Sequence, residues 1–296
     1  MEFRVLKYFL AVAREETISG AAEFLHVTQP TLSRQLMDLE DSVGKQLMIR
    51  GGRKITLTNE GMLLRKRAEE IVALMEKTEN ELASDESDIT GDIYIGCGES
   101  ESNRFLAKAI KKIQTESPQI HFHLQSGNSL DICEKIDKGL LDFGILIEPG
   151  IPDTHKYDYI QLPYEDNWGM LMRKDDPLAA KEQLLADDVW EKPIICSRQS
   201  VHTKEFAAWL KNDPDKLNIT NTYNLLYNAT LLVEEGVGYA MCLDKLANIN
   251  ESSPLCFRPF YPKLSVHFDF IWKKYQVFSK ASELFLNMIK EEYQSE

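Results

Sequence analysis

The stretch QPTLSR carries, within six residues, side chains that can read the edges of DNA bases. An arginine such as Arg34 can hold guanine through two hydrogen bonds, and a glutamine such as Gln29 can hold adenine in the same way. Pro30 and Thr31 offer apolar contacts to thymine methyl groups, and Ser33 can reach a base or a phosphate. Short polar groups also suit the solvated face of an ordinary helical hairpin, so this stretch alone leaves both interpretations open.

The elements around this stretch predict how it is presented. Proline is tolerated in the first turn of a helix, so Pro30 marks a helix start with Thr28 as its N-cap. The helix before it ends near Leu25, and its inner face is Ile18, Ala21, Ala22 and Leu25. The second helix has an apolar seam at Leu32, Leu36, Leu39 and Val43. Two helices joined by such a short turn are typical of a helix-turn-helix, whose second helix enters the major groove.

The flanking segments complete a small domain. Apolar residues at helical spacing predict a first helix, and they are Phe3, Leu6, Phe9, Leu10 and Ala13. Downstream, QLMIRGGRKITLT predicts a strand, a Gly51-Gly52 turn and a second strand, which together form a hairpin wing. Its cations, Arg50, Arg53 and Lys54, can hold phosphates and fix the register without reading sequence. An ordinary basic hairpin is the alternative, and it is weaker directly after a helical hairpin.

Taken together, these motifs resemble the amino-terminal winged domain of the LysR-type transcriptional regulators. The resemblance rests on AAEFLHVTQPTLSRQLMDLE, on its spacing to Arg50 and Arg53, and on the LTNEG that opens the next helix. It is strong to about residue 90 and continues by pattern beyond. It implies a regulator that binds double-stranded DNA and works with RNA polymerase, with Gln29, Pro30, Thr31, Ser33 and Arg34 facing the groove. Met48 stands where the family usually has phenylalanine.

The charge of the chain is distributed unevenly. The 296 residues carry a formal net charge of −13, which argues against a nonspecific nucleic-acid coat but not against a sequence reader. Residues 1–60 hold eight basic and eight acidic side chains, so the excess of acid lies in the remainder. No export signal and no apolar run of membrane-spanning length is present, so we expect a cytoplasmic protein that does not enter a membrane.

The cysteines are odd in number and scattered: Cys97, Cys133, Cys196, Cys242 and Cys256. This usage favours reduced thiols in a cytoplasm. Some members of the resembled family sense oxidants through a close cysteine pair in the distal domain. Here Cys196 has no cysteine partner within the following forty residues, which argues against a peroxide switch, although Cys242 and Cys256 can still approach in space.

A long helix is expected in residues 59–90. Apolar and small side chains alternate at steps of four and three, which is the seam of a coiled coil: Leu64, Ala68, Ile71, Met75, Thr78 and Leu82. Burial of this seam against its own chain is the alternative to self-association. The resemblance implies antiparallel pairing of such helices into a homodimer, and commonly a homotetramer. The polar stretch SDESDITGD then marks a hinge.

The second half of the chain alternates strands and helices in the βαβ rhythm of a mostly parallel sheet. We therefore predict an α/β multidomain protein with three parts: a winged helix-turn-helix (1–58), a linker helix and hinge (59–90), and an effector-binding domain (91–296). The last part is two-lobed, with lobe I at about 91–161 and 265–296 and lobe II at about 162–264. Its pattern resembles the LysR effector domain, itself similar to periplasmic solute-binding proteins.

Ligands in open α/β sheets bind beyond the carboxyl ends of the strands and at helix amino termini. That rule selects as effector-binding candidates Ser100, Glu101, Ser102, Ser126, Asn128, Ser197, Ser200, Tyr223, Asn224 and Asn228. Many such residues in any α/β protein are only N-caps or loop polar groups. Glu99 and Glu101 place carboxylates where an anion would normally bind, which favours a neutral or cationic effector if Glu101 faces the cleft.

Other chemistry finds little support. The fragment GCGESE lacks the third glycine of a dinucleotide loop, and neither a P-loop nor G-x-S-x-G is present. His121 and His123 share a strand face without an obvious third ligand, so we expect no metal. No nucleophile with an orienting base appears, so we expect no enzyme and no cofactor. The sequence predicts a regulator that responds to a small-molecule effector. A solute-binding module without a DNA-binding role and an α/β enzyme are the alternatives.

Overall fold

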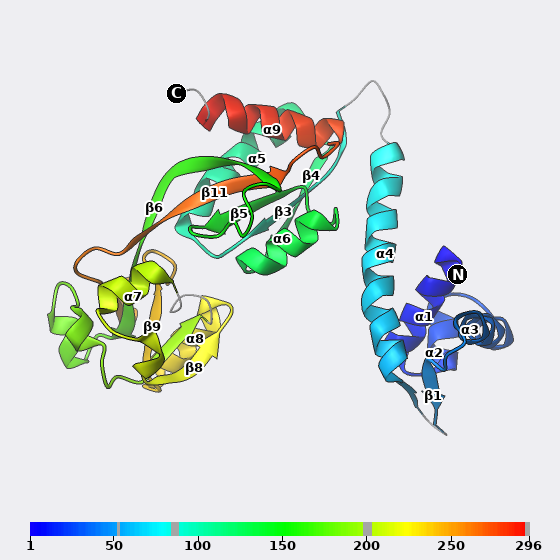
Figure 1. Ribbon diagram of the computed structural model, residues 1–296, viewed down its shortest axis with the longest axis horizontal. Helices are drawn as coiled ribbons and strands as arrows, with labels where there is room; N and C mark the ends of the chain where they lie inside the picture. The colour runs from blue at the N-terminus through cyan, green and yellow to red at the C-terminus, as the bar shows by residue number, and fades with distance from the viewer. Residues whose placement is uncertain (52–53, 84–88, 198–202, 294–296) are drawn as a thin grey trace. The chain divides into compact units, whose positions relative to one another are not determined.

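The computed structural model describes residues 1–51, 54–83, 89–197 and 203–293 (Figure 1). The chain divides into two compact units, Met1–Ala83 and Ser84–Glu296. The long helix that follows the winged domain belongs to the first unit. No helix in the described part of the chain is both long and apolar enough to cross a membrane.

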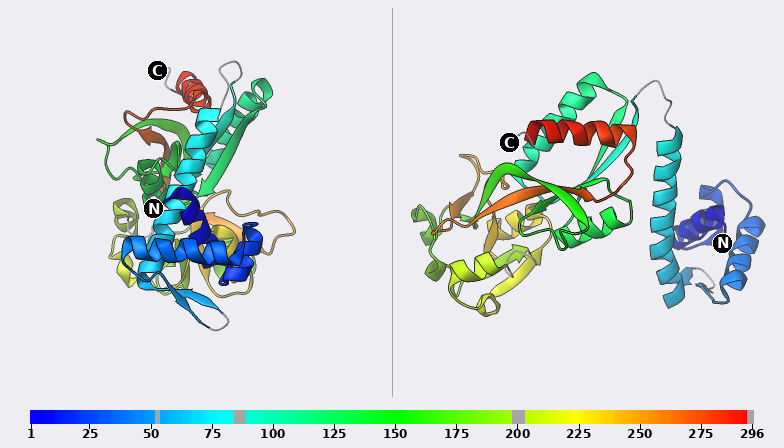
Figure 2. Two further views of the ribbon diagram at one scale, coloured as in Figure 1. Left: turned by 90° about the vertical axis from the view of Figure 1, so that its right-hand side faces the viewer. Right: turned by 45° about the horizontal axis from the view of Figure 1, so that its top comes forward.

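The first unit contains the predicted helix-turn-helix and wing. Its elements are α1 (Phe3–Glu15), α2 (Ile18–Phe24), α3 (Gln29–Val43), β1 (Met48–Arg50), β2 (Ile55–Leu57) and α4 (Asn59–Ala83). The N-cap prediction is confirmed, because the Thr28 hydroxyl accepts a hydrogen bond from the Thr31 amide at 3.4 Å. The two strands pair antiparallel, and the hairpin projects beyond the helices (Figure 2).

Burial of α3 follows the predicted seam, whereas burial of α1 follows its predicted face only in part. Leu32, Leu36 and Leu39 are buried, and Val43 is partly buried against the same core. In α1 the buried side chains are Val5, Leu6, Phe9, Ala11 and Val12. The expected face is therefore confirmed at Leu6 and Phe9 and at Leu10, which packs partly buried against the core, whereas Phe3 and Ala13 are partly buried outside that core. The reason is that α2 and α3 contact α1 on one side while α4 contacts it on another.

The carboxylate of Glu40 joins the wing to α3. Its Oε1 accepts hydrogen bonds from the amides of Leu47 at 2.7 Å and Met48 at 3.0 Å. Met48 is buried, so methionine fills the core position where the resembled family usually has phenylalanine. One carboxylate thus satisfies two amides at the point where the chain enters the hairpin.

The start of α4 explains the glycine of LTNEG. The Thr58 hydroxyl donates to the Gln46 carbonyl at 2.8 Å and accepts from the Gly61 amide at 3.0 Å. A Cβ added to Gly61 would lie 2.0 Å from the Leu47 carbonyl oxygen. Only glycine lets α4 approach the entry to the wing this closely.

The second unit is a two-lobed α/β domain. Its strands are β3 (Gly91–Cys97), β4 (Ile120–Ser126), β5 (Phe143–Ile147), β6 (Tyr157–Arg173), β7 (Ile194–Ser197), β8 (Ile219–Tyr223), β9 (Tyr239–Leu243), β10 (Leu255–Pro259) and β11 (Ser265–Lys273). Its helices are α5 (Arg104–Glu116), α6 (Ser129–Asp137), α7 (Lys204–Leu210), α8 (Leu226–Glu234) and α9 (Lys280–Tyr293), with short 3-10 turns such as Glu101–Asn103. The strand order is β4-β3-β5-β11-β6-β9-β7-β8, and β10 pairs with β6.

The sheet is mixed rather than mostly parallel. Parallel pairs occur within each lobe, at β3 with β4 and β5 and at β7 with β8 and β9. The strands that cross between lobes pair antiparallel: β11 with β5 and β6, and β6 with β9 and β10. The first half of β6 was not predicted. The register between β6 and β11 shifts around Pro163, which has no amide to donate to the ladder.

One strand, β6, belongs to both lobes. Its first half pairs with β11 in lobe I, and its second half pairs with β9 in lobe II (Figure 1). In lobe I, α5 and α9 cover one sheet face around Phe143, Phe270 and Phe285, while α6 covers the other. In lobe II, a second core forms around Phe206, Trp209 and Phe260. The lobes are therefore separate cores on a shared strand.

Glu40→Ala should lower the free energy of unfolding of the full chain by about 1–3 kcal/mol, because two part-buried amides lose their acceptor. Urea unfolding followed by circular dichroism measures this loss. Asp41→Ala changes the neighbouring exposed carboxylate and should have a much smaller effect. Equal stability of the two variants would show that Glu40 does not hold the wing.

Candidate nucleic-acid interface and ligand pocket

The face of α3 opposite its buried seam is open to solvent. Gln29, Pro30, Thr31 and Arg34 are exposed, and Ser33 is partly buried. The guanidinium of Arg34 forms no ion pair within the described residues. This face therefore carries donors and acceptors that are ready to meet another molecule. It has the residue types that read base edges in the major groove.

The wing follows α3 in the chain and carries predicted cations, two of which already form ion pairs with carboxylates of the first unit. An Arg50 nitrogen lies 3.6 Å from Glu40 Oε2, and the Lys54 amine contacts the Glu16 carboxylate. Both basic side chains are exposed, and exposed ion pairs contribute little stability, so a phosphate can compete with these carboxylates. Arg53, the third predicted cation, lies outside the described residues.

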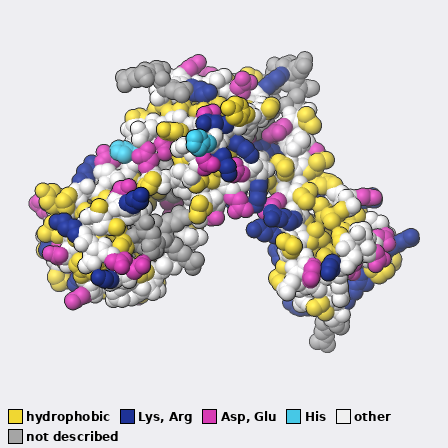
Figure 3. Space-filling model, in the orientation of Figure 1, with side chains coloured by type: hydrophobic (Ala, Val, Ile, Leu, Met, Phe, Trp, Pro, Cys, Tyr) yellow, Lys and Arg dark blue, Asp and Glu magenta, His cyan; other side chains and the backbone are white. Residues whose placement is uncertain are grey.

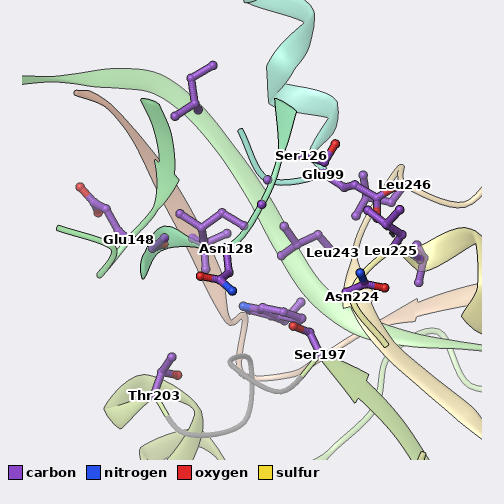
Figure 4. A pocket seen from close by; sticks show the side chains of 18 of the residues that line it. Glu99, Ser126, Asn128, Glu148, Ser197, Thr203, Asn224, Leu225, Leu243 and Leu246 are labelled. Carbon is purple, nitrogen blue, oxygen red and sulfur yellow. Dashed lines mark hydrogen bonds between the residues drawn. The ribbon is translucent and has the colours of Figure 1, made fainter. Parts of the chain in front are cut away.

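A cavity of about 660 Å³ lies between the two lobes of the second unit. That size is typical of sites for small organic molecules. Five predicted residues line it, and they are Ser126, Asn128, Ser197, Tyr223 and Asn224. Figure 4 shows Asn128 of lobe I and Ser197 of lobe II on either side of the cavity. The residues that the strand-end rule predicted in both lobes therefore include five that line one cavity.

Three predicted effector residues serve the fold instead. Ser100 Oγ donates to Asp166 at 2.6 Å, and Ser102 Oγ donates to the same carboxylate at 3.1 Å. Asp166 is only 1% exposed, so these hydroxyls satisfy a buried charge and do not line the cavity. Glu101 also lies off the cavity and pairs with Arg104. The condition that Glu101 faces the cleft is therefore not met.

Two other predicted effector residues, Asn228 and Ser200, are not among the described residues that line the cavity. Asn228 is exposed on α8 and does not line the cavity, because the helix turns it away after Leu226. Ser200 lies outside the described residues. The sequence reading missed several lining residues, among them Glu148, Trp168, Thr203, Glu205, Leu243 and Leu246. Glu148 follows β5 directly, so the strand-end rule could have found it, whereas Trp168 lies within β6 and gives no local signal.

Asp269 of β11 is a buried carboxyl group beside the pocket wall. It is 4% exposed, and its Oδ1 has no hydrogen-bond partner among the described residues. Burial, together with the neighbouring Glu148 carboxylate, raises the pKa of Asp269 to about 7. Glu148 in turn accepts a hydrogen bond from the Gln161 amide at 2.7 Å and points away from the other labelled pocket residues (Figure 4).

All five cysteines are free and buried. Burial raises the pKa of each thiol, to about 11 for Cys196 and about 12 for Cys242. Cys242 and Cys256 lie on β9 and β10, which flank β6, at registers opposite Gly169 and Met172. They are therefore not neighbours. Buried thiols with raised pKa react slowly with oxidants because the thiolate is the reactive form.

The predicted seam of α4 is divided between two environments. Ala68 is fully buried within its own chain, and Leu64 packs against the core of the first unit. The assignment of Ala68 to dimerisation was therefore wrong, because it leaves no surface for a second copy, whereas Leu64 is partly buried by its own chain and keeps part of its surface exposed. Ile71, Met75 and Leu82 are exposed, at 47%, 42% and 81%. They lie on one side of the rest of α4, because steps of four and seven residues return to nearly the same helix face, and together they form an apolar strip. Figure 3 shows apolar side chains exposed on the first unit.

The comparisons with known proteins agree with both halves of this arrangement. Residues 3–62 match the family model described as bacterial regulatory helix-turn-helix protein, lysR family. Residues 86–294 match the model of the LysR substrate binding domain. The chain therefore belongs to the LysR family of DNA-binding transcriptional regulators and carries an effector-binding domain. A solute-binding module alone does not account for residues 3–62.

Relatives match along most of the chain. It is 28% identical over 281 residues to the Hca operon transcriptional activator HcaR of Escherichia coli (strain K12), covering 93% of this chain and 92% of HcaR. It is 30% identical over 213 residues to the HTH-type transcriptional activator IlvY of Salmonella typhimurium, covering 71% of each. The solved structure of full-length CbnR complexed with its target DNA has a TM-score of 0.77 at 19% identity, covering 98% of this chain and 99% of CbnR. At that identity the structural likeness shows the fold alone.

Asp269→Asn should make stability less dependent on pH. In the wild type, Asp269 has a raised pKa, so its contribution to stability is complete below about pH 4, where the carboxyl is protonated in both the folded and the unfolded chain. This contribution is lost as the pH rises through about 7, when the buried carboxyl must ionise. The neutral amide avoids this loss, so the variant should gain roughly 1–3 kcal/mol on the wild type between pH 5 and pH 9. Urea unfolding across this range measures the change. The exposed Asp158→Asn should show no such trend, and a pH-independent difference for Asp269→Asn would contradict the assignment.

Proposed function

We propose that α3 reads operator bases in the major groove, that the wing holds phosphates, and that a small molecule in the interlobe pocket regulates this binding. The observation that carries the proposal is the exposed polar face of α3 opposite a fully buried leucine seam. Because one face of the helix is packed in the core, the opposite face is presented to solvent with little freedom to reorient. Rigid presentation is what base readout requires.

DNA recognition divides between the two parts of the surface. Arg34 and Gln29 have the side chains that form paired hydrogen bonds with guanine and adenine. Arg50 and Lys54 contribute charge, which supplies affinity without sequence preference. Full-length CbnR, which has a similar fold, has been solved in complex with its target DNA, and this supports a DNA-binding role here.

The signal is proposed to be a bound small molecule rather than oxidation of a cysteine. The interlobe cavity has the volume of an organic ligand, and polar residues from both lobes line it. The thiols are buried and their pKa values are raised, which disfavours the thiolate that reacts with peroxide. A ligand regulates only if it binds one lobe arrangement better than another.

The working form is proposed to be a homodimer or a homotetramer in the cytoplasm, which contacts RNA polymerase and has no enzymatic activity or cofactor. Two half-sites read by two copies give a groove reader its specificity. The exposed apolar strip of α4 (Ile71, Met75 and Leu82) supports self-association, because apolar side chains repeat there on one helix. Its partner surface is proposed to be the same strip of a second copy.

Arg34→Ala should weaken operator binding by about 1–3 kcal/mol, a loss of roughly 5- to 150-fold in affinity, and should relax base preference at one position. The operator is first selected from random duplexes with the full chain, and affinity is then measured by fluorescence anisotropy. Arg104→Ala removes an exposed arginine from the second unit and should leave affinity unchanged. If Arg34→Ala kept the wild-type base preference, α3 would not be the reading helix.

Ile71→Asp should convert the oligomer to a smaller species, because a carboxylate in an apolar interface loses its hydration. Light scattering coupled to size-exclusion chromatography measures the mass of each variant at micromolar concentration. Glu79→Ala, at an exposed position of the same helix, should keep the wild-type mass. A wild-type chain that is monomeric under these conditions would exclude the proposed assembly.

A further inference from the structure

The charged residues that the structure describes around the interlobe pocket are all acidic. Among the described lining residues there are four acidic residues (Glu99, Asp131, Glu148 and Glu205) and no lysine, arginine or histidine. Of the four, Glu148 turns its carboxylate away toward Gln161. The four come from both lobes, since Glu205 lies on α7 and the others lie in lobe I. A cleft lined by one sign of charge concentrates ions of the opposite sign.

The helix amino termini around the pocket, which would otherwise attract an anion, already bind oxygen atoms of the chain itself. At α8 the Leu226 amide donates to Glu99 Oε2 at 2.7 Å. At α6 the Asp131 amide donates to the Asn128 side-chain oxygen at 2.8 Å. At α7 the Phe206 amide donates to the Thr203 hydroxyl at 3.2 Å.

The contact at α8 is the most restrictive of the three. Glu99 follows β3 in lobe I, whereas Leu226 begins α8 in lobe II, so this hydrogen bond joins the two lobes at the cavity. A carboxylate of the chain therefore occupies the positive end of a helix whose first residue lines the pocket. A ligand carboxylate that approached this amide would meet Glu99 and be repelled, whereas a ligand cation would be attracted.

Apolar side chains supply the remaining walls. Trp168, Leu243, Leu246 and Val266 line the same cavity. The indole of a tryptophan can pack against an apolar body and can also attract a cation over its face. The cavity thus combines apolar walls with carboxylates.

From these contacts we infer that the pocket takes an organic cation, an amine or guanidine carried on an apolar body, with Glu99 as its charge partner. This inference rests on the proposed function, because it names the ligand class of the same pocket. Residues 198–202, which include Arg198 and His202, lie outside the described residues.

The test measures the potential inside the pocket without knowledge of the effector. Ser126 is exposed and lines the cavity, so Ser126→Cys places a reactive thiol there, while the five native cysteines are buried. The full chain is treated with two methanethiosulfonate reagents of similar size, one carrying a trimethylammonium group and one a sulfonate. Each modification rate is divided by the rate of the same reagent with free 2-mercaptoethanol, and the parent chain gives the background.

The cationic reagent should react faster than the anionic one by about ten-fold or more after this normalisation. Adding Glu99→Gln should reduce the ratio by roughly three-fold, because one of the charges is lost. Glu116→Gln, a change of the same type at the end of α5 and away from the lining residues, should leave the ratio unchanged. Circular dichroism and thermal unfolding check that each variant is folded.

A ratio of one or less would overturn the inference, since it would show that the pocket does not favour cations. A ratio insensitive to Glu99→Gln would overturn the role of Glu99. No reaction with either reagent would show a pocket closed to ligands of this size and would equally end the proposal. The rates need no DNA, so a high ratio in a chain that fails to bind DNA would reject the proposed function and leave the inference standing.

Discussion

The continuity of β6 is the constraint on which the effector-binding domain depends. This strand pairs with β11 in lobe I and with β9 and β10 in lobe II, so neither lobe can move without bending it. Each lobe has its own aromatic core, around Phe143 and Phe285 in one and Trp209 and Phe260 in the other. Two rigid bodies on a shared strand leave a cavity whose width follows from the angle between them. That arrangement makes the pocket sensitive to whatever binds both walls.

The first unit depends on a different but equally simple constraint, which is one-sided burial. Leu32, Leu36 and Leu39 fix which side of α3 faces the core, and the polar side is exposed as a consequence. Glu40, one residue beyond the last of these leucines, holds the wing through two amides. The same helix therefore sets both the reading face and the entry to the hairpin.

The sequence predicted what local signals determine. Pro30, the Thr28 cap and the leucine seam lie within fifteen residues of one another, so no distant contact was needed to place α3. The roles of Ser100 and Ser102 depend on Asp166, which is more than sixty residues away, and no local pattern reveals that partner. The half of β6 around Pro163 was missed for a related reason. Pro163, which has no amide to donate to a ladder, argues against a strand there, and pairing with β11 overrides this local signal.

The hydrogen bond between Glu99 and the Leu226 amide connects these observations to the regulation that we propose. It joins the lobes directly, on the pocket side, in addition to the shared strand. A cation that draws the Glu99 carboxylate toward itself weakens this bond and forms its own contacts with both walls. The lobe arrangement that has this bond and the arrangement that lacks it then differ in their affinity for the cation. Such a difference in affinity is what a ligand needs to shift a conformational equilibrium. A ligand that left Glu99 in place would still favour the lobe angle that fits both walls, but its binding would carry no signal through this bond.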